Sequence, residues 1–175
     1  MRLLTPISLL LPLAFLFFSG CTGYQRGSLP DAHTASVYLK PVQNEAYLSG
    51  IAPLFQSELR QQILDSRTLI LADKPEDADM EAYVRLVDYN EEPIGYLETD
   101  TGQPISARLS LSALITLSET DSEGDYLLED SRVSIDTAVY SSPSTAFPNP
   151  VDQSKPAMAR NLAQKVVLQL ELQRP

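Results

Sequence analysis

The sequence has one cysteine, one histidine and no tryptophan among its 175 residues. A single cysteine excludes an intrachain disulfide framework, and Cys21 and His33 alone supply too few ligands for a zinc site. A Ser-His-Asp triad would have to use His33, which lies in a polar stretch, so we expect no catalytic residues. Cations are also scarce, with 13 Lys and Arg against 23 Asp and Glu. A nucleic-acid partner is not expected, because phosphate binding requires clustered Lys and Arg.

The one long apolar run lies at the amino terminus. Arg2 precedes an apolar run over residues 3–18, which contains two prolines and is followed by the small residues Ser19 and Gly20. This order is typical of an export signal, and the prolines and small residues argue against the alternative, a membrane-spanning anchor. We therefore predict a cleaved signal peptide over residues 1–20.

The cysteine directly follows this signal. Phe18-Ser19-Gly20-Cys21 resembles the lipobox of bacterial lipoproteins, in which small side chains precede the cysteine. The resemblance implies a diacylglycerol on the thiol of Cys21 and an N-linked acyl chain on its amine, more than the two signals that stable anchoring needs. The alternative is an unlipidated signal with an incidental cysteine. Thr22 stands where the inner-membrane retention signal has Asp, so the resemblance implies an outer-membrane location. We expect no other cofactor.

The rest of the chain divides into a tether and one domain. Residues 21–34 are rich in Gly, Ser, Pro and polar residues, which predicts a tether. Residues 35–175 hold the patterned segments, and a chain with 43% apolar and 21% charged residues can build a core. This length fits a single domain of ordinary size.

Alternation of apolar and polar residues predicts the strands of that domain. The alternating segments are 35–40, 80–87, 107–118 and 132–139. Their one apolar and one polar face predict a mostly antiparallel sheet of about four strands. A short apolar segment at residues 69–71 predicts a further strand or strand entry, and long polar loops are expected over residues 90–106 and 141–152.

Spacings of three and four residues predict two helices. The first is expected to begin at Ser49 or Gly50 and to end at Ser66, and the second to be capped by Ser154 with Pro156 in its first turn. The apolar stripes are Leu54, Phe55, Leu59 and Ile63 in the first helix, and Met158, Ala159, Leu162, Ala163, Val166 and Leu170 in the second. Both helices are expected to pack on one face of the sheet, as an α+β two-layer sandwich.

Acidic residues cluster between residues 73 and 81 and stand side by side at Glu91 and Glu92. The spacing in the first group fits no Ca²⁺-binding loop, which favours a solvated loop over a metal site. Adjacent carboxylates on an extended chain point apart, which argues against acid–base catalysis by the second group. We therefore expect neither a metal site nor an active site.

Cations from four segments fall on the polar face of the predicted sheet. They are Lys40, Arg85, Arg108 and Arg132. Three tyrosines are expected on the same face: Tyr38, Tyr83 and Tyr89. Guanidinium groups and aromatic rings on one open surface would suit the phosphates of an anionic glycolipid, so we take the four cations as candidate contacts. The alternative is that they only keep an exposed face soluble and discourage edge pairing.

Short motifs follow one another through the chain in a distinctive order. They are Cys21, Gly23-Tyr24, Leu29-Pro30, the strand at 36–44, Asp77-Ala78-Asp79 and the segment Val87-Asp88-Tyr89-Asn90-Glu91-Glu92-Pro93. With the hairpin and last helix, this order resembles the LptE family of lipopolysaccharide-assembly lipoproteins. The resemblance implies a protein that plugs the outer-membrane β-barrel LptD and helps deliver lipopolysaccharide to the outer leaflet. Direct binding of lipopolysaccharide by this protein is a further expectation from the resemblance.

The residues alone indicate an anchored interaction domain that is not an enzyme. The first hypothesis is the barrel plug, held by its lipid on the periplasmic side of the outer membrane, and a polar surface suits the polar lumen of a barrel. The second hypothesis is a periplasm-facing lipoprotein that activates or scaffolds a cell-wall synthase or a secretion machine. The first predicts a stable complex with a barrel, and the second predicts a soluble-domain partner.

Overall fold

A six-stranded sheet and two helices make up the described part of the chain, a computed structural model over residues 34–98, 100–120, 126–140 and 150–173. The strands are β1 (Ala35–Leu39), β2 (Gln43–Asn44), β3 (Leu69–Ala72), β4 (Met80–Leu97), β5 (Asp100–Glu119) and β6 (Tyr126–Tyr140). The helices are α2 (Ile51–Asp65), α3 (Pro150–Leu172) and the short 3₁₀ helix η1 (Pro75–Asp77). Among the described helices, neither long one is apolar enough over a sufficient length to span a bilayer.

The sheet is mixed, with strand order β3-β1-β4-β5-β6 and β2 beside β4. β1 runs parallel to β3 and β4, β2 runs parallel to β4, and β4, β5 and β6 pair antiparallel. The prediction of an α+β two-layer arrangement is therefore confirmed, while the expected sheet of about four mostly antiparallel strands has too few strands and lacks the parallel pairings of β1, β2 and β3. The further strand predicted at residues 69–71 is present as β3. The parallel part arises because α2 connects β1 to β3, and such a crossover returns the chain in the same direction.

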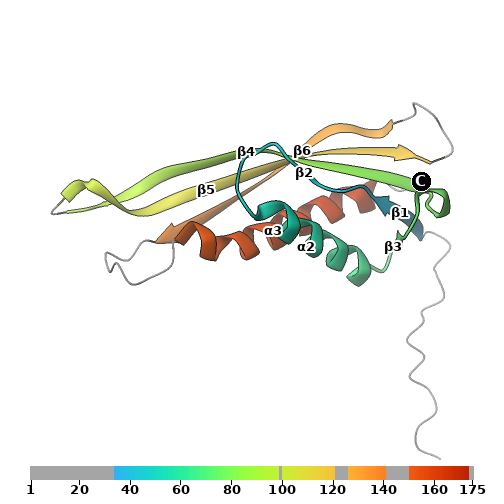
Figure 1. Cartoon of the computed structure of the whole chain (residues 1–175), viewed down its shortest axis with the longest axis horizontal. Coiled ribbons are helices and arrows are strands. Elements are labelled where there is room, and N and C mark those ends of the chain that lie inside the picture. Colours follow the sequence, from blue (N-terminus) through green and yellow to red (C-terminus); the bar gives the residue numbers. More distant parts are fainter. Residues whose placement is uncertain (1–33, 99, 121–125, 141–149, 174–175) are drawn as a thin grey trace, which may run out of the picture. The chain divides into compact units, whose positions relative to one another are not determined.

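Both helices lie on the same side of the sheet (Figure 1). α2 begins after Gly50, whose φ of 75° is one that glycine adopts without a Cβ clash. Its last residue is Asp65 and Ser66 is its C-cap, which agrees with the predicted end. Its buried stripe is Ile51, Phe55, Leu59 and Ile63. Leu54 was predicted in this stripe, but it is 38% exposed because Ile51 occupies the matching position one turn before Phe55.

α3 begins earlier than its sequence signals predict. Ser154 lies inside the helix rather than at its start, where its buried hydroxyl donates a hydrogen bond to the carbonyl of Val151 at 2.8 Å. Pro156 is likewise inside the helix. The true first turn starts with Pro150, whose missing N–H has no partner to lose there. An ion pair of 2.6 Å between Lys155 and Asp152 supports this turn.

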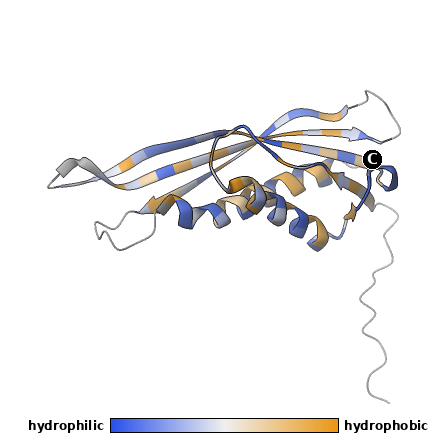
Figure 2. Cartoon of the chain, viewed as in Figure 1, coloured by the Kyte–Doolittle hydropathy of each residue, from blue (hydrophilic) through white to orange (hydrophobic). Residues whose placement is uncertain are grey.

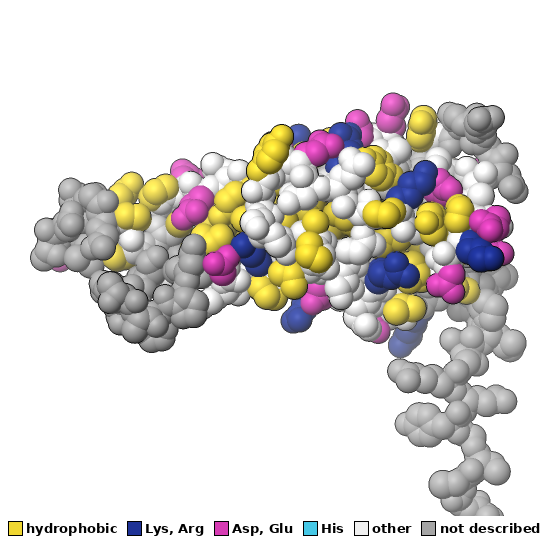
Figure 3. Space-filling view, viewed as in Figure 1, with side chains coloured by type: hydrophobic (Ala, Val, Ile, Leu, Met, Phe, Trp, Pro, Cys, Tyr) yellow, Lys and Arg dark blue, Asp and Glu magenta, His cyan; other side chains and the backbone are white. Residues whose placement is uncertain are grey.

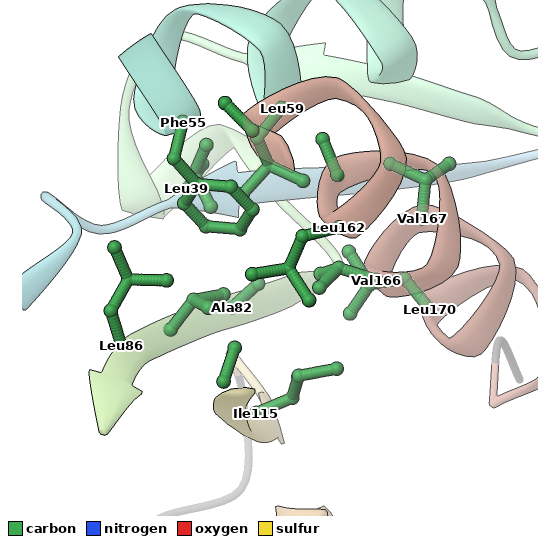
Figure 4. Close-up of a cluster of buried hydrophobic side chains, with 14 of the residues drawn as sticks. Leu39, Phe55, Leu59, Ala82, Leu86, Ile115, Leu162, Val166, Val167 and Leu170 are labelled. Atoms are coloured by element: carbon green, nitrogen blue, oxygen red, sulfur yellow. The ribbon is translucent and has the colours of Figure 1, made fainter. Parts of the chain in front are cut away.

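The core lies between the helices and the inner face of the sheet (Figure 4). The predicted stripe of α3 is fully buried, as are the inward residues of β4 up to Leu86. On β5, the alternating residues from Ala107 to Leu117 are all buried, as the pattern predicted. The same alternation appears as alternating colours along the strands in Figure 2.

A β-bulge at Val87 changes which side chains of β4 face the helices. Leu86 pairs with Ala113, but the register then shifts and Tyr89 pairs with Leu111. Because Leu111 faces the core, the odd-numbered residues of β4 face the helices after the bulge, whereas the even-numbered ones do so before it.

The far end of the β4–β5 hairpin extends past the helices (Figure 1). Its residues 90–98 and 100–106, called here the arm, were predicted to be a polar loop, and this prediction is wrong because β4 and β5 continue to pair there. Pro93 is tolerated because β4 has no second neighbour at this point, so its missing N–H breaks no ladder bond. Of the second predicted loop, residues 150–152 belong to α3 and residues 141–149 lie outside the described part.

Candidate functional site

The face of the sheet opposite the helices, called here the outer face, has no helix over it in the described residues. Its side chains are mainly polar, and small hydroxyls lie along its centre. Ser112 and Ser134 form a cross-strand pair whose hydroxyl oxygens are 2.9 Å apart. Strand alternation places Tyr38 and Tyr83 on this face, as predicted.

Tyr89 is on the other side of the sheet. It was predicted to share the outer face, but the bulge at Val87 turns it toward the helices, where it packs against the core. Its hydroxyl donates to Glu91 at 3.4 Å. Burial raises the pKa of Tyr89 to about 12, and the negative charges of Glu91 and Asp152 act in the same direction.

The four candidate cations lie on the outer face but do not form one cluster. Arg85 and Arg132 belong to one cross-strand row, with Leu114 of β5 between them. Arg108 is opposite Glu92 and about six residues farther along β5 than Leu114, roughly 20 Å by strand geometry.

Each of these cations is paired with a carboxylate. The pairs are Lys40 with Glu81, Arg85 with Asp130 at 2.8 Å and with Glu45 at 3.4 Å, Arg108 with Glu92 at 3.3 Å, and Arg132 with Asp88. The strand pattern located the cations but missed these acids, because register and the backbone turns bring them into contact. On the face seen in Figure 3, Lys and Arg side chains lie beside Asp and Glu side chains.

Asp130 reaches Arg85 because of a local feature of the backbone. Its φ is 45°, and it lies where β6 bulges against β5, between the pairs Ile115–Ser131 and Leu117–Leu128. From this position its carboxylate accepts hydrogen bonds from Arg85 and, at 3.2 Å, from the hydroxyl of Thr116. The bond to Asp130 raises the pKa of Arg85 above its ordinary value, so this guanidinium stays charged.

A shallow groove of about 350 Å³ follows the outer face beside these pairs. Its lining is Lys40, Gln43, Glu81, Tyr83, Thr116, Ser118 and Tyr126. A second hollow shares Tyr83, Thr116 and Tyr126 and continues to Arg85 and Asp130. Sequence reasoning missed Tyr126, which lies outside the predicted alternating segment 132–139.

Asp79, from the predicted acidic loop, has a structural contact. Its carboxylate accepts hydrogen bonds from the backbone N–H and the hydroxyl of Ser36, at 2.7 and 2.6 Å, and so ties the start of β4 to β1. These bonds lower the pKa of Asp79 below its ordinary value. Within the described residues, no group of three or more His, Cys, Asp or Glu side chains is arranged to hold a metal ion. Cys21, His33, the predicted signal and nearly all of the tether lie outside those residues.

Comparison with protein families gives a match over most of the chain. The family model LptE, described as lipopolysaccharide-assembly, matches residues 34–170. No curated protein matched the sequence.

Solved structures resemble the fold at low sequence identity. The hypothetical protein CT253 from Chlamydia trachomatis is 11% identical, with a TM-score of 0.53, over 79% of this chain and 96% of that one. Protein XCC0632 from Xanthomonas campestris is 10% identical, with a TM-score of 0.54, over 82% and 89%. The uncharacterized lipoprotein B from Nitrosomonas europaea is 12% identical, with a TM-score of 0.49, over 86% and 88%. At such identities, the first two likenesses show the fold alone.

Proposed function

Because the chain belongs to the LptE family of lipopolysaccharide-assembly proteins, we propose that it plugs and supports the outer-membrane β-barrel LptD during delivery of lipopolysaccharide to the outer leaflet. Members of this family are non-enzymatic components of the cell envelope that work with the lipopolysaccharide-transport machinery. The observation that carries the proposal is the family match over residues 34–170, which spans the sheet and most of α3.

The chemistry of the outer face supports a place inside a barrel. Porin-type lumens are polar, so a protein that fills one needs polar side chains where it meets the wall. The outer face offers hydroxyls and paired charges, which can exchange hydrogen bonds with such a wall without leaving an unpaired charge buried.

The proposal includes a lipid anchor on Cys21, with a diacylglycerol on sulfur and an acyl chain on the amine. It places the protein on the periplasmic side of the outer membrane. The test is to separate membranes from cells that produce the full chain or a Cys21→Ser variant. The full chain should carry the acyl chains and fractionate with outer membranes, whereas the Cys21→Ser variant should lack the acyl chains and leave the membrane fraction. Equal fractionation of the two proteins would contradict the anchor.

The barrel partner is tested by affinity purification of the carboxy-tagged full chain from detergent-solubilised membranes. A large β-barrel recovered in equal amount and identified as LptD by mass spectrometry supports the proposal. Recovery of a periplasmic or inner-membrane synthase without a barrel contradicts it and favours the second hypothesis, an activator or scaffold of a cell-wall synthase or secretion machine.

Contact between the four cations and lipopolysaccharide phosphates stays a prediction. Phosphate would have to compete with the carboxylates that already bind these side chains. Replacing Arg85, Arg108 and Arg132 together by Ser should weaken binding to lipopolysaccharide without unfolding the domain, because all three side chains lie on the outer face. An unchanged affinity in a titration would contradict this contact.

A further inference from the structure

Two tyrosines and two small hydroxyl residues build the groove on the outer face. Tyr83 of β4 pairs with Thr116 of β5, and Ser118 of β5 pairs with Tyr126 of β6. The tyrosines therefore stand on either side of β5, about two strand spacings apart across the sheet and two residues apart along it, or roughly 12 Å. The small side chains of Thr116 and Ser118 lie between them and leave the space that the groove occupies.

The charges along this groove are already matched with one another. Lys40 pairs with Glu81, and Arg85 pairs with Asp130 and Glu45. An incoming phosphate would have to displace carboxylates, and a basic peptide would have to displace cations. A ligand without charge can instead use the remaining N–H donors and carboxylate lone pairs while these ion pairs stay intact.

We propose that this groove binds a sugar ring of an uncharged saccharide. A pyranose has a C–H face that can pack on the ring of Tyr83 or Tyr126, and hydroxyls around its edge that both donate and accept hydrogen bonds. The hydroxyls of Thr116 and Ser118 and the paired side chains of Lys40 and Glu81 supply the matching polar groups. The inference deepens the proposed function and rests on it for the source of the sugar, which is the saccharide part of lipopolysaccharide.

The groove's chemistry suits any neutral glycan, so the experiment compares two sources. The full chain in detergent is titrated by calorimetry with a neutral hexose oligosaccharide from the outer core of lipopolysaccharide, and separately with neutral N-acetylglucosamine oligomers that stand for the glycan strands of the cell wall. We expect binding of the neutral core oligosaccharide. Binding of the N-acetylglucosamine oligomers alone would overturn the assignment of the source.

Variants locate the binding in the groove. Tyr126→Ala should weaken binding about tenfold or more, because an aromatic anchor is lost. Tyr140→Ala is the matched control, since Tyr140 lies at the other end of β6 and is 77% exposed against 56% for Tyr126. Ser118→Leu fills the floor of the groove without changing either tyrosine and should abolish binding. Circular dichroism establishes that each variant is folded.

Three results would overturn the inference. They are no heat of binding with either glycan, equal loss of binding in the Tyr126→Ala and Tyr140→Ala variants, and displacement of the glycan by a lysine-rich peptide. The barrel pull-down separates this inference from the proposed function. A chain that recovers LptD but does not bind the saccharide refutes the groove alone, and a chain that binds the saccharide without LptD refutes the plug alone.

Discussion

The two parts of β4 on either side of Val87 share a partner strand but differ in what covers them. Before the bulge, the inward side chains from Met80 to Leu86 are fully buried under the helices. In the arm, Ile94 is 45% exposed and Tyr96 is 49% exposed. Hydrogen-bond pairing with β5 is enough to continue the hairpin, but only the covered part adds the burial that stabilises the fold.

The largest expected difference in the free energy of unfolding is between a core variant and an arm variant. Leu162 of α3 is fully buried in the cluster of Figure 4, so Leu162→Ala should lower the free energy of unfolding by about 2–5 kcal/mol. Ile94→Ala removes a half-exposed side chain of the arm and should change it by about 0.5 kcal/mol or less. Urea denaturation followed by circular dichroism measures both. Equal losses would show that the arm is covered in the folded protein.

A smaller loss of stability is expected for a substitution at Asp79, just before the covered part of β4. Asp79→Ala removes both bonds to Ser36 and should cost about 1 kcal/mol, whereas Asp77→Ala removes the same charge two residues away and should cost less. The folded-state pKa of Asp79 lies below its ordinary value of 3.8. Its contribution is therefore present above pH 3.8 and is lost as the pH falls below it. A difference between the variants that stays constant through this range would contradict the assignment.

The bulge itself can be tested at high pH. Tyr89 faces the helices only because of the bulge, and its folded-state pKa is about 12 against an ordinary value of 10.0. The unfolded chain loses this proton first, so the stabilising contribution of Tyr89 is complete below pH 10.0 and falls as the pH rises toward about 12. Tyr89→Phe should remove this component of the pH dependence. If the free energy of unfolding fell equally with pH in both proteins, Tyr89 would not be buried against the helices.

The smallest effect is expected for the ion pair at the arm. Arg108 and Glu92 are both about half exposed, with side-chain exposures of 52% and 58%. A double-mutant cycle with Arg108→Ala and Glu92→Ala should give a coupling energy of about 0.5 kcal/mol or less. A coupling well above that value, or one that is insensitive to salt, would show that the arm is held in a drier environment than its exposure indicates.

The predictable features of this fold are those that repeat along the chain. Apolar residues alternate from Ala107 to Leu117, and they recur every four residues at Phe55, Leu59 and Ile63. Each pattern marks the buried face several times over, so both faces were predicted correctly. The bulge at Val87 is a single extra residue with no compositional signal of its own. Unbroken alternation through Val87 would place Tyr89 on the outer face, and this is why the face of Tyr89 was predicted wrongly.

Other features depend on partners that are distant in the sequence. The arm carries Pro93 and neighbouring acids that disfavour strands, and only its pairing with β5 makes it one. The two-residue β2 is too short for a periodic pattern, and the four-residue β3 was indicated only by its short apolar run. The positions of the four cations followed from alternation, but the carboxylates that neutralise them depend on register, and Asp130 depends on its positive φ.

The place of β1 in the sheet has a mechanical consequence. β1 is the first described strand, and it is bonded on one side to β3 and on the other to β4. A force applied to the chain before Ala35 would enter the domain at the first residue of this strand. The hydrogen bonds of both ladders lie across the strand axis, so a force along that axis would load them in shear, and they would have to fail together rather than one after another. A protein held by its amino terminus would thus bear tension on a strand flanked on both sides.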